Sequence, residues 1–165
     1  MTFTPRTWVV GEVVSAAIMN QEVRDQFNSM FAAWTAYTPT WTSSGTAPNI
    51  QNGTLTGRYM KYGRTVLCEI NMVTGSTTTY GTGNYNWSLP FTAANAGISV
   101  VGTAQLLAVA RWNGAIVISP NAANCSAFLP VASNDTRSNF MTATAPETIA
   151  AGAQVRLAFT YESAT

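Results

Sequence analysis

The chain has 165 residues, enough for one domain that buries roughly two-thirds of its unfolded surface. Only 9% of the residues are charged, and the formal net charge is +1. So little charge excludes electrostatic attraction to nucleic acid or anionic lipid, and no apolar run reaches the ~18 residues that membrane insertion needs.

Residues 1–14, MTFTPRTWVVGEVV, carry more apolar side chains than a free terminus exposes comfortably. Pro5 and Gly11 break any helix, and the segment is too short to form a core of its own. We expect it to lie extended against another chain, either a sister subunit or a larger particle, with Trp8 as an anchor. It lacks the charged and apolar regions of a secretory signal.

Residues 15–34, SAAIMNQEVRDQFNSMFAAW, have helical periodicity. Ser15 can cap this helix, and Val14 can pack on Met19 as a hydrophobic staple. Spacings of three and four place one stripe on the helix: Ala16, Asn20, Val23, Phe27, Met30 and Trp34, flanked by Met19 and Phe31.

The stripe has two interpretations. It can cover the chain's own sheet, or it can form a short coiled-coil seam between identical chains, which we favour because Asn20 suits a register-setting position. A seam of roughly two and a half heptads is marginal alone, so we expect a homotrimer in which the β domains share the interface. Residues 1–36 would then be the anchor and oligomerisation segment.

Residues 37–165 show β patterns, and eight or so short strands between turn residues predict one antiparallel sandwich or jelly-roll domain. Alternation predicts the inward side chains. These are Val66, Cys68, Ile70 and Met72, then Tyr85, Trp87 and Leu89, and finally Val155, Leu157, Phe159 and Tyr161.

The stretch GRYMKYGRTVLCEINM predicts a hairpin with a two-residue turn at Tyr62–Gly63. Its register would pair Lys61 with Arg64, Tyr59 with Val66, Gly57 with Cys68 and Leu55 with Ile70. Cys68 then lies in the core as a small apolar residue instead of a reactive thiol, with Gly57 leaving room for it. Arg58 and Glu69 would form a diagonal pair on the outer face.

Asn113-Gly114 is the strongest short hairpin signal in the chain and predicts a turn that pairs Trp112 with Ala115 and Ala110 with Val117. Tyr80 and Trp112 can stack on sugar rings as surface contacts, although aromatic residues beside turns more often fold back over the sheet.

Histidine is absent, which removes Ser-His-Asp triads, Cys-His dyads and the usual zinc sites. Cys68 and Cys125 have neither a metal-binding spacing nor a disulfide framework. No pair of carboxylates is placed by the sequence to face across a cleft, as glycoside hydrolysis requires. The sequence therefore predicts no enzyme, no cofactor and no metal site.

The succession TPRTWVVGEVVSAAIMNQEVRDQFN, YTPTWTSSG, GTLTGRYMKYGRTV and GSTTTYGTGNYNWSLPF resembles small virion proteins of tailed phages, usually described as minor tail proteins and associated with actinobacterial hosts. The similarity extends as far as Phe91, and the closing PETIAAGAQVRLAFTYE matches more loosely.

The resemblance implies a virion structural protein that assembles in the host cytoplasm and contacts other virion proteins. One location is a tail tip or fibre, where the protein would meet the host surface and a glycan on it. The alternative is a capsid decoration or head-spike protein held by its N-terminal segment.

Overall fold

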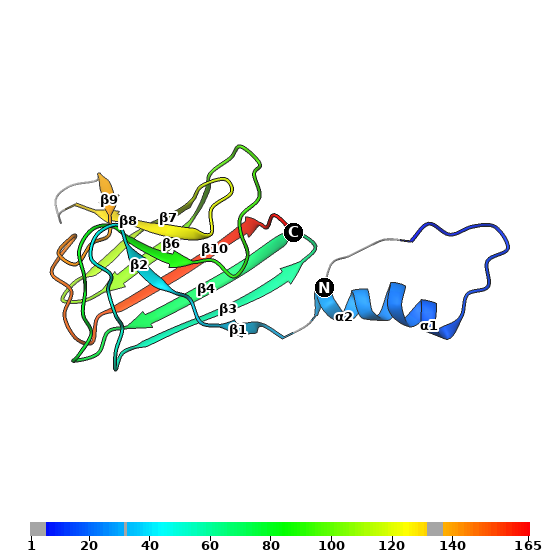
Figure 1. Cartoon of the computed structure of the whole chain (residues 1–165), viewed down its shortest axis with the longest axis horizontal. Helices are drawn as coiled ribbons and strands as arrows, with labels where there is room; N and C mark the ends of the chain where they lie inside the picture. Colours follow the sequence, from blue (N-terminus) through cyan, green and yellow to red (C-terminus); the bar gives the residue numbers. More distant parts are fainter. Residues whose placement is uncertain (1–5, 32, 132–136) are drawn as a thin grey trace.

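The computed structural model describes residues 6–31, 33–131 and 137–165. Within these, an N-terminal segment and a helix project from one end of a β body (Figure 1). Strands account for 44% of the chain and helix for 9%, and the sheet is curled. This confirms the predicted class, a mainly antiparallel, sandwich-like β domain preceded by one helix.

The helix runs as α1 (Ala16–Met19), a π-helical stretch η1 (Asn20–Arg24) and α2 (Asp25–Met30). Ser15 caps it as predicted, because its hydroxyl oxygen accepts the Ile18 N–H at 3.3 Å. The expectation that the helix reaches Trp34 is wrong. The chain leaves the helix after Met30 and soon pairs with the sheet.

Ten strands lie in the described residues: β1 (Thr35–Tyr37), β2 (Trp41–Ser43), β3 (Thr54–Tyr62), β4 (Thr65–Val73), β5 (Tyr85–Ser88), β6 (Val100–Leu107), β7 (Arg111–Ile118), β8 (Asn124–Pro130), β9 (Ser138–Phe140) and β10 (Gln154–Glu162). Their order is β1-β3-β4-β10-β6-β7-β8-β5-β2, with β9 paired to β8. All of these pairings are antiparallel.

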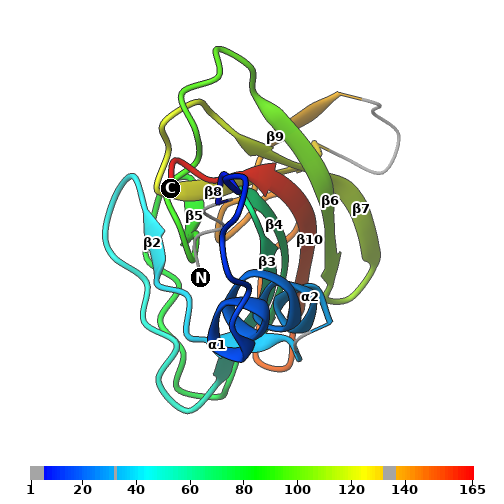
Figure 2. The same cartoon turned by 90° about the vertical axis from the view of Figure 1, so that its right-hand side faces the viewer.

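The two edges of this sheet are close neighbours, because residues 38–40 alone lead from β1 at one edge to β2 at the other. A link of this length spans at most ~14 Å between Tyr37 and Trp41. The sheet must therefore curl around its core, as Figure 2 shows. The boundary expected between residues 36 and 37 falls inside β1.

The inward face carries the side chains that alternation predicts. All eleven predicted inward residues are buried: Val66, Cys68, Ile70, Met72, Tyr85, Trp87, Leu89, Val155, Leu157, Phe159 and Tyr161. They form one cluster with apolar side chains of β2, β6, β7 and β8. Period-2 alternation therefore identified this part of the core correctly.

The β3–β4 hairpin has the predicted strands, but its turn differs. Tyr62 pairs with Thr65, so the turn residues are Gly63 and Arg64, and the predicted turn at Tyr62–Gly63 is wrong. Gly63 has φ +58° and takes the first central position, where a type II′ turn requires positive φ. The partners change by two residues, so the same side chains still face the core.

The corrected register gives Gly57 a different role. Tyr59 lies opposite Cys68, and Gly57 lies opposite Ile70. A Cβ on Gly57 would stand 2.4 Å from Cε1 of Tyr37, so this glycine makes room for the Tyr37 ring and not for the thiol.

The predicted outer pair of the hairpin is also rearranged. Arg58 and Glu69 are directly opposite instead of diagonal, with 2.6 Å between Nη2 and Oε2. Both side chains are exposed, so this ion pair contributes little to stability.

The predicted turn at Asn113-Gly114 is wrong, since both residues lie inside β7. Asn113 pairs with Gln105 and Gly114 with Ala104, and the chain turns at residues 108–110 instead. A turn at Asn113-Gly114 would pair Trp112 with Ala115 and not with Leu106, and because this shifts the register by an odd number of residues, inward side chains would lie opposite outward ones. Gly114 is required for close approach, because a Cβ there would lie 2.0 Å from the Phe128 carbonyl oxygen.

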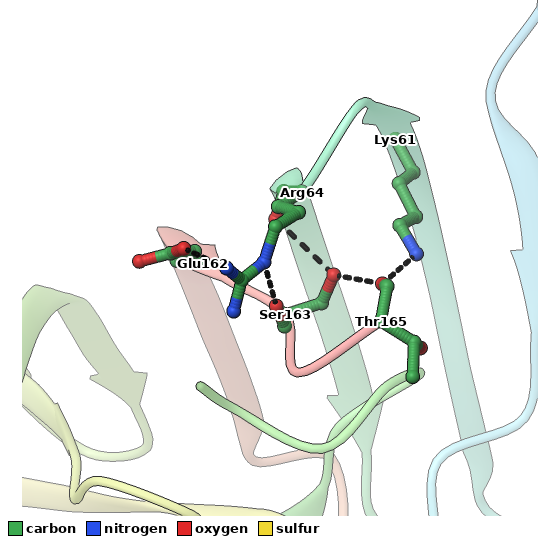
Figure 3. A network of polar contacts seen from close by, with 5 residues as sticks. All are labelled: Lys61, Arg64, Glu162, Ser163 and Thr165. Atoms are coloured by element: carbon green, nitrogen blue, oxygen red, sulfur yellow. Dashed lines mark hydrogen bonds and ion pairs between the residues drawn. The ribbon is translucent and has the colours of Figure 1, made fainter. Parts of the chain in front are cut away.

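The last residues fix the end of β10 to the β3–β4 hairpin (Figure 3). Buried Ser163 donates its N–H to the Arg64 carbonyl at 2.7 Å, and Arg64 Nε donates to the Ser163 carbonyl at 3.0 Å. Arg64 Nη1 pairs with Glu162 Oε1 at 3.1 Å, and the Lys61 ammonium contacts a backbone oxygen of Thr165. The cations at this tip therefore stabilise the strand ends.

Candidate functional site

The N-terminal segment and the helix carry most of the large apolar side chains that the described chain leaves exposed. They are Trp8, Val9, Val10, Val13, Val14, Met19, Val23, Phe27, Met30 and Phe31. We call this set the N-terminal apolar surface. A monomeric protein rarely exposes so many neighbouring apolar side chains unless they form an interaction site.

The arm before the helix is not extended throughout, so that expectation is wrong for residues 9–12. Glu12 donates its N–H to the Val9 carbonyl at 3.1 Å, and Gly11 takes φ +85° within the turn. The Glu12 carboxylate pairs with Arg6 at 2.5 Å, and the Arg6 guanidinium lies 5.4 Å from the Trp8 ring centre. The turn still leaves Trp8 45% exposed. Pro5, predicted to break any helix in this segment, lies outside the described residues.

The helix buries none of the side chains described on it. Phe27 is 57% exposed and Met30 is 55% exposed, and the helix points away from the body (Figure 1). The interpretation that the stripe covers the chain's own sheet is therefore wrong. Spacings of four and three leave Met19, Val23, Phe27 and Met30 on one side of the helix, where each stays between 38% and 57% exposed.

Trp34 does not belong to this stripe, which corrects its predicted role. Its ring is half-buried, and the Arg58 guanidinium lies 4.9 Å from the ring centre. The cause is the early end of the helix, since β1 begins at Thr35 and pairs Thr35 with Tyr59. Trp34 therefore packs against the body at the root of the projecting segment.

Both cysteines are buried in the core as free thiols. The Tyr37 hydroxyl lies 3.2 Å from Cys68 Sγ and 3.4 Å from the Ser88 carbonyl oxygen. Burial raises the pKa of the Cys68 thiol to about 11 and that of Cys125 to about 12. Thiols that stay protonated and covered are poor nucleophiles. Cys68 has the structural environment that the sequence predicted.

Tyr80 and Trp112, the predicted surface aromatics, are both half-buried and packed against the core. The Tyr80 carbonyl accepts the Tyr85 hydroxyl at 2.7 Å. The Trp112 indole nitrogen is buried and has no hydrogen-bond partner in the described structure. Both rings therefore fold back over the sheet, which was the alternative weighed for them.

The outer face of the sheet holds a groove of about 810 Å³, which we call the outer groove. It crosses β3, β4, β10, β6 and β7, which lie side by side (Figure 2). Register places one outward polar side chain from each strand in a single row: Thr56, Asn71, Arg156, Gln105 and Asn113. We call these five residues the polar row.

Sequence reasoning missed this site. Alternation marks each of these side chains as outward, but the row appears only when β10 is inserted between β4 and β6. No local signal specifies that order, because the three strands are far apart along the chain.

Among the described residues no group of three His, Cys, Asp or Glu side chains is close enough to hold a metal ion. The helices described in the structure are all too short or too polar to cross a membrane. Comparison with models of known protein families, with curated proteins and with solved structures finds no match to this chain. The functional argument therefore depends on the N-terminal apolar surface and the outer groove.

Proposed function

We propose that this chain is a structural protein of a tailed-phage virion, attached by its N-terminal segment and displaying its β body at the tail tip or fibre for contact with the host surface. The observation that carries the proposal is the N-terminal apolar surface, whose side chains the described chain leaves at least 38% exposed. Covering it requires another protein, and its position at one end of the molecule suits an anchor (Figure 1).

The opposite end of the body supports display. Figure 1 shows the loops 44–53 and 74–84 at the end of the body away from the helix. Asn49 and Thr79 exchange two backbone hydrogen bonds of 2.8 and 2.9 Å between them. The Asn52 carboxamide oxygen accepts from the Thr77 N–H at 3.0 Å and from its hydroxyl at 2.8 Å. These contacts hold a polar, uncharged tip in one shape.

Self-association is part of the proposal. One helix exposes Val23, Phe27 and Met30 on one side, and three copies would bury these side chains against one another. The seam is short, so the bodies would share the contact. We therefore propose a homotrimer that joins other virion proteins through residues 6–14.

Deleting residues 2–14 tests the anchor. The truncated chain should keep the unfolding midpoint of the β body, because residues 6–14 lie beside and beyond α1, at the end of the helix away from the body (Figure 1), but it should not enter particles. A full-length control with Trp8, Val9, Val10 and Val13 changed to Ser separates apolar contact from length, and it should fail in the same way. Normal incorporation of both variants would contradict the proposal.

The same plan of an anchor and a displayed body would suit a capsid decoration or head-spike protein. Immunogold labelling of intact particles distinguishes the two locations, since our proposal expects gold at the tail tip. Gold over the capsid would replace the tail location with the head location.

A further inference from the structure

The outer groove lies between two unlike walls. The polar row forms one wall. The next row across the same strands contains small side chains at its centre, Ala158 and Thr103, which form the floor. Beyond this floor the groove continues into a hollow of about 370 Å³ whose lining includes Leu67, Val101 and the Trp34 ring. One side therefore offers hydrogen bonds and the other offers apolar contact.

The polar row is connected by its own hydrogen bonds. Arg156 Nη1 donates to Gln105 Oε1 at 2.9 Å, and Arg156 Nη2 donates to Gln154 Oε1 at 2.6 Å. Gln105 Nε2 then donates to Asn113 Oδ1 at 2.8 Å. These bonds hold the guanidinium in place before any ligand arrives, which reduces the entropy lost on binding.

The charge of Arg156 is not compensated by a carboxylate among the described residues. Its partners are neutral amides, whereas the other groove cation, Arg58, is paired with Glu69 at 2.6 Å. The groove therefore presents one fixed, exposed positive charge. A guanidinium of this kind forms strong, charge-assisted hydrogen bonds with an anionic group.

Neutral donors flank this charge. The side-chain amide of Asn71 and the amide nitrogen of Asn113 have no partner in the described structure and are exposed at the groove. Amides donate and accept, and so do the hydroxyl groups of sugars and polyols. Five strands at a spacing of about 4.8 Å give the row a length of about 19 Å, which suits an extended chain with repeated hydroxyl groups.

We propose that the outer groove binds a hydroxyl-rich, anionic surface polymer, with its negative group at Arg156, its hydroxyl groups along the polar row and its apolar edge toward Leu67 and Val101. A uronate polysaccharide and a polyol phosphate share this chemistry. One uncompensated charge is too little for a nucleic acid, whose binding requires several phosphate contacts. Only the source of the polymer, a host surface, rests on the proposed function.

Titration calorimetry on the isolated full-length chain tests the groove with four probes. An oligogalacturonate carries carboxylates, an oligo(glycerol phosphate) carries phosphates, maltohexaose is neutral, and a single-stranded oligonucleotide is the competing polyanion. At least one of the first two should bind, and maltohexaose and the oligonucleotide should bind at least about tenfold more weakly. The anionic probe that binds more tightly shows whether the polymer is a uronate polysaccharide or a polyol phosphate.

Variants place the binding in the groove. Arg156→Gln should lower the affinity for the anionic probe about tenfold, and Arg156→Lys should lower it less. Asn113→Ala should lower the same affinity several-fold. Arg24→Gln, on the helix, is the matched control and should leave binding unchanged. Unfolding midpoints confirm that each variant is folded.

Three results would overturn the proposal: no binding of either anionic probe, equal binding of maltohexaose or the oligonucleotide, or equal affinity of Arg156→Gln and the unaltered chain. None of these results affects incorporation into particles, which depends on the N-terminal segment. Failure of the groove is therefore distinguishable from failure of the proposed function.

Discussion

Cys68 and Cys125 are surrounded by aromatic and aliphatic side chains on the inward face of the sheet, where water cannot stabilise a thiolate. Burial is the main cause of their raised pKa values, and it also raises the pKa of Tyr37, Tyr85 and Tyr161 above the usual range. All five groups are acids that the native state keeps neutral.

Because the native state keeps these groups protonated, the free energy of unfolding decreases as the pH becomes alkaline. Below about pH 8 both thiols are protonated in the folded and the unfolded chain and have no pH-dependent effect. Above the ordinary thiol pKa of 9.0, the unfolded chain loses protons that the folded chain keeps, until pH passes about 11 for Cys68 and about 12 for Cys125. We expect the free energy of unfolding to fall by up to ~1.4 kcal/mol per thiol and pH unit.

Urea unfolding at pH 8, 9 and 10 measures this loss, to which the buried tyrosines, with an ordinary pKa of 10.0, add a smaller share that begins about one pH unit higher. Cys125→Ala should reduce the slope between pH 9 and 10, since one of the two acids is gone. A flat profile over this range would show that the thiols are not sheltered.

At the scale of the elements, alternation was enough to predict which side chains of β4, β5 and β10 face the core. It was not enough for the turns. The β3–β4 turn was misplaced because glycine suits either central position of a two-residue turn, and only the ladder decides between them. In β7, the close approach of Gly114 to Phe128 overrides the local preference of Asn-Gly for a turn.

β1 is held by a specific fit of Tyr37 over Gly57. Gly57→Ala should destabilise the body by ~1–3 kcal/mol, because the new Cβ would overlap the ring and displace the strand. Chemical unfolding gives the size of the effect. In a Tyr37→Ala background the same substitution should cost much less, and an equal cost in both backgrounds would show that the ring is not responsible.

At the scale of the molecule, the outer groove could not be predicted from the sequence, since it depends on which distant strands become neighbours. The start and the cap of the projecting helix could be predicted, but its end and its orientation could not. Periodicity identifies an apolar side of a helix and does not specify whether that side meets the same chain or another.

The proposed trimer can be tested with substitutions in the helix of the full-length chain, which leave the β body unaltered. Phe27→Asp should reduce the mass measured by sedimentation from that of a trimer to 17.6 kDa, because the charge would be buried in the seam. Asn28→Asp adds the same charge at a neighbouring position away from Phe27 and should leave the trimer intact. Equal masses for the two variants would contradict the seam.

Under the proposed attachment by the N-terminus, the short path from the helix through β1 to β2 would also determine how the protein carries mechanical load. Tension between an anchored N-terminus and a body attached to a surface enters the body at β1, which is held by only three residue pairs with β3. The next contact that resists separation of β1 is the Tyr37 ring, which packs over Gly57 and contacts Cys68. Beyond it the pull passes through residues 38–40 to the opposite edge of the sheet, so resistance depends on this ring more than on the length of the edge strand.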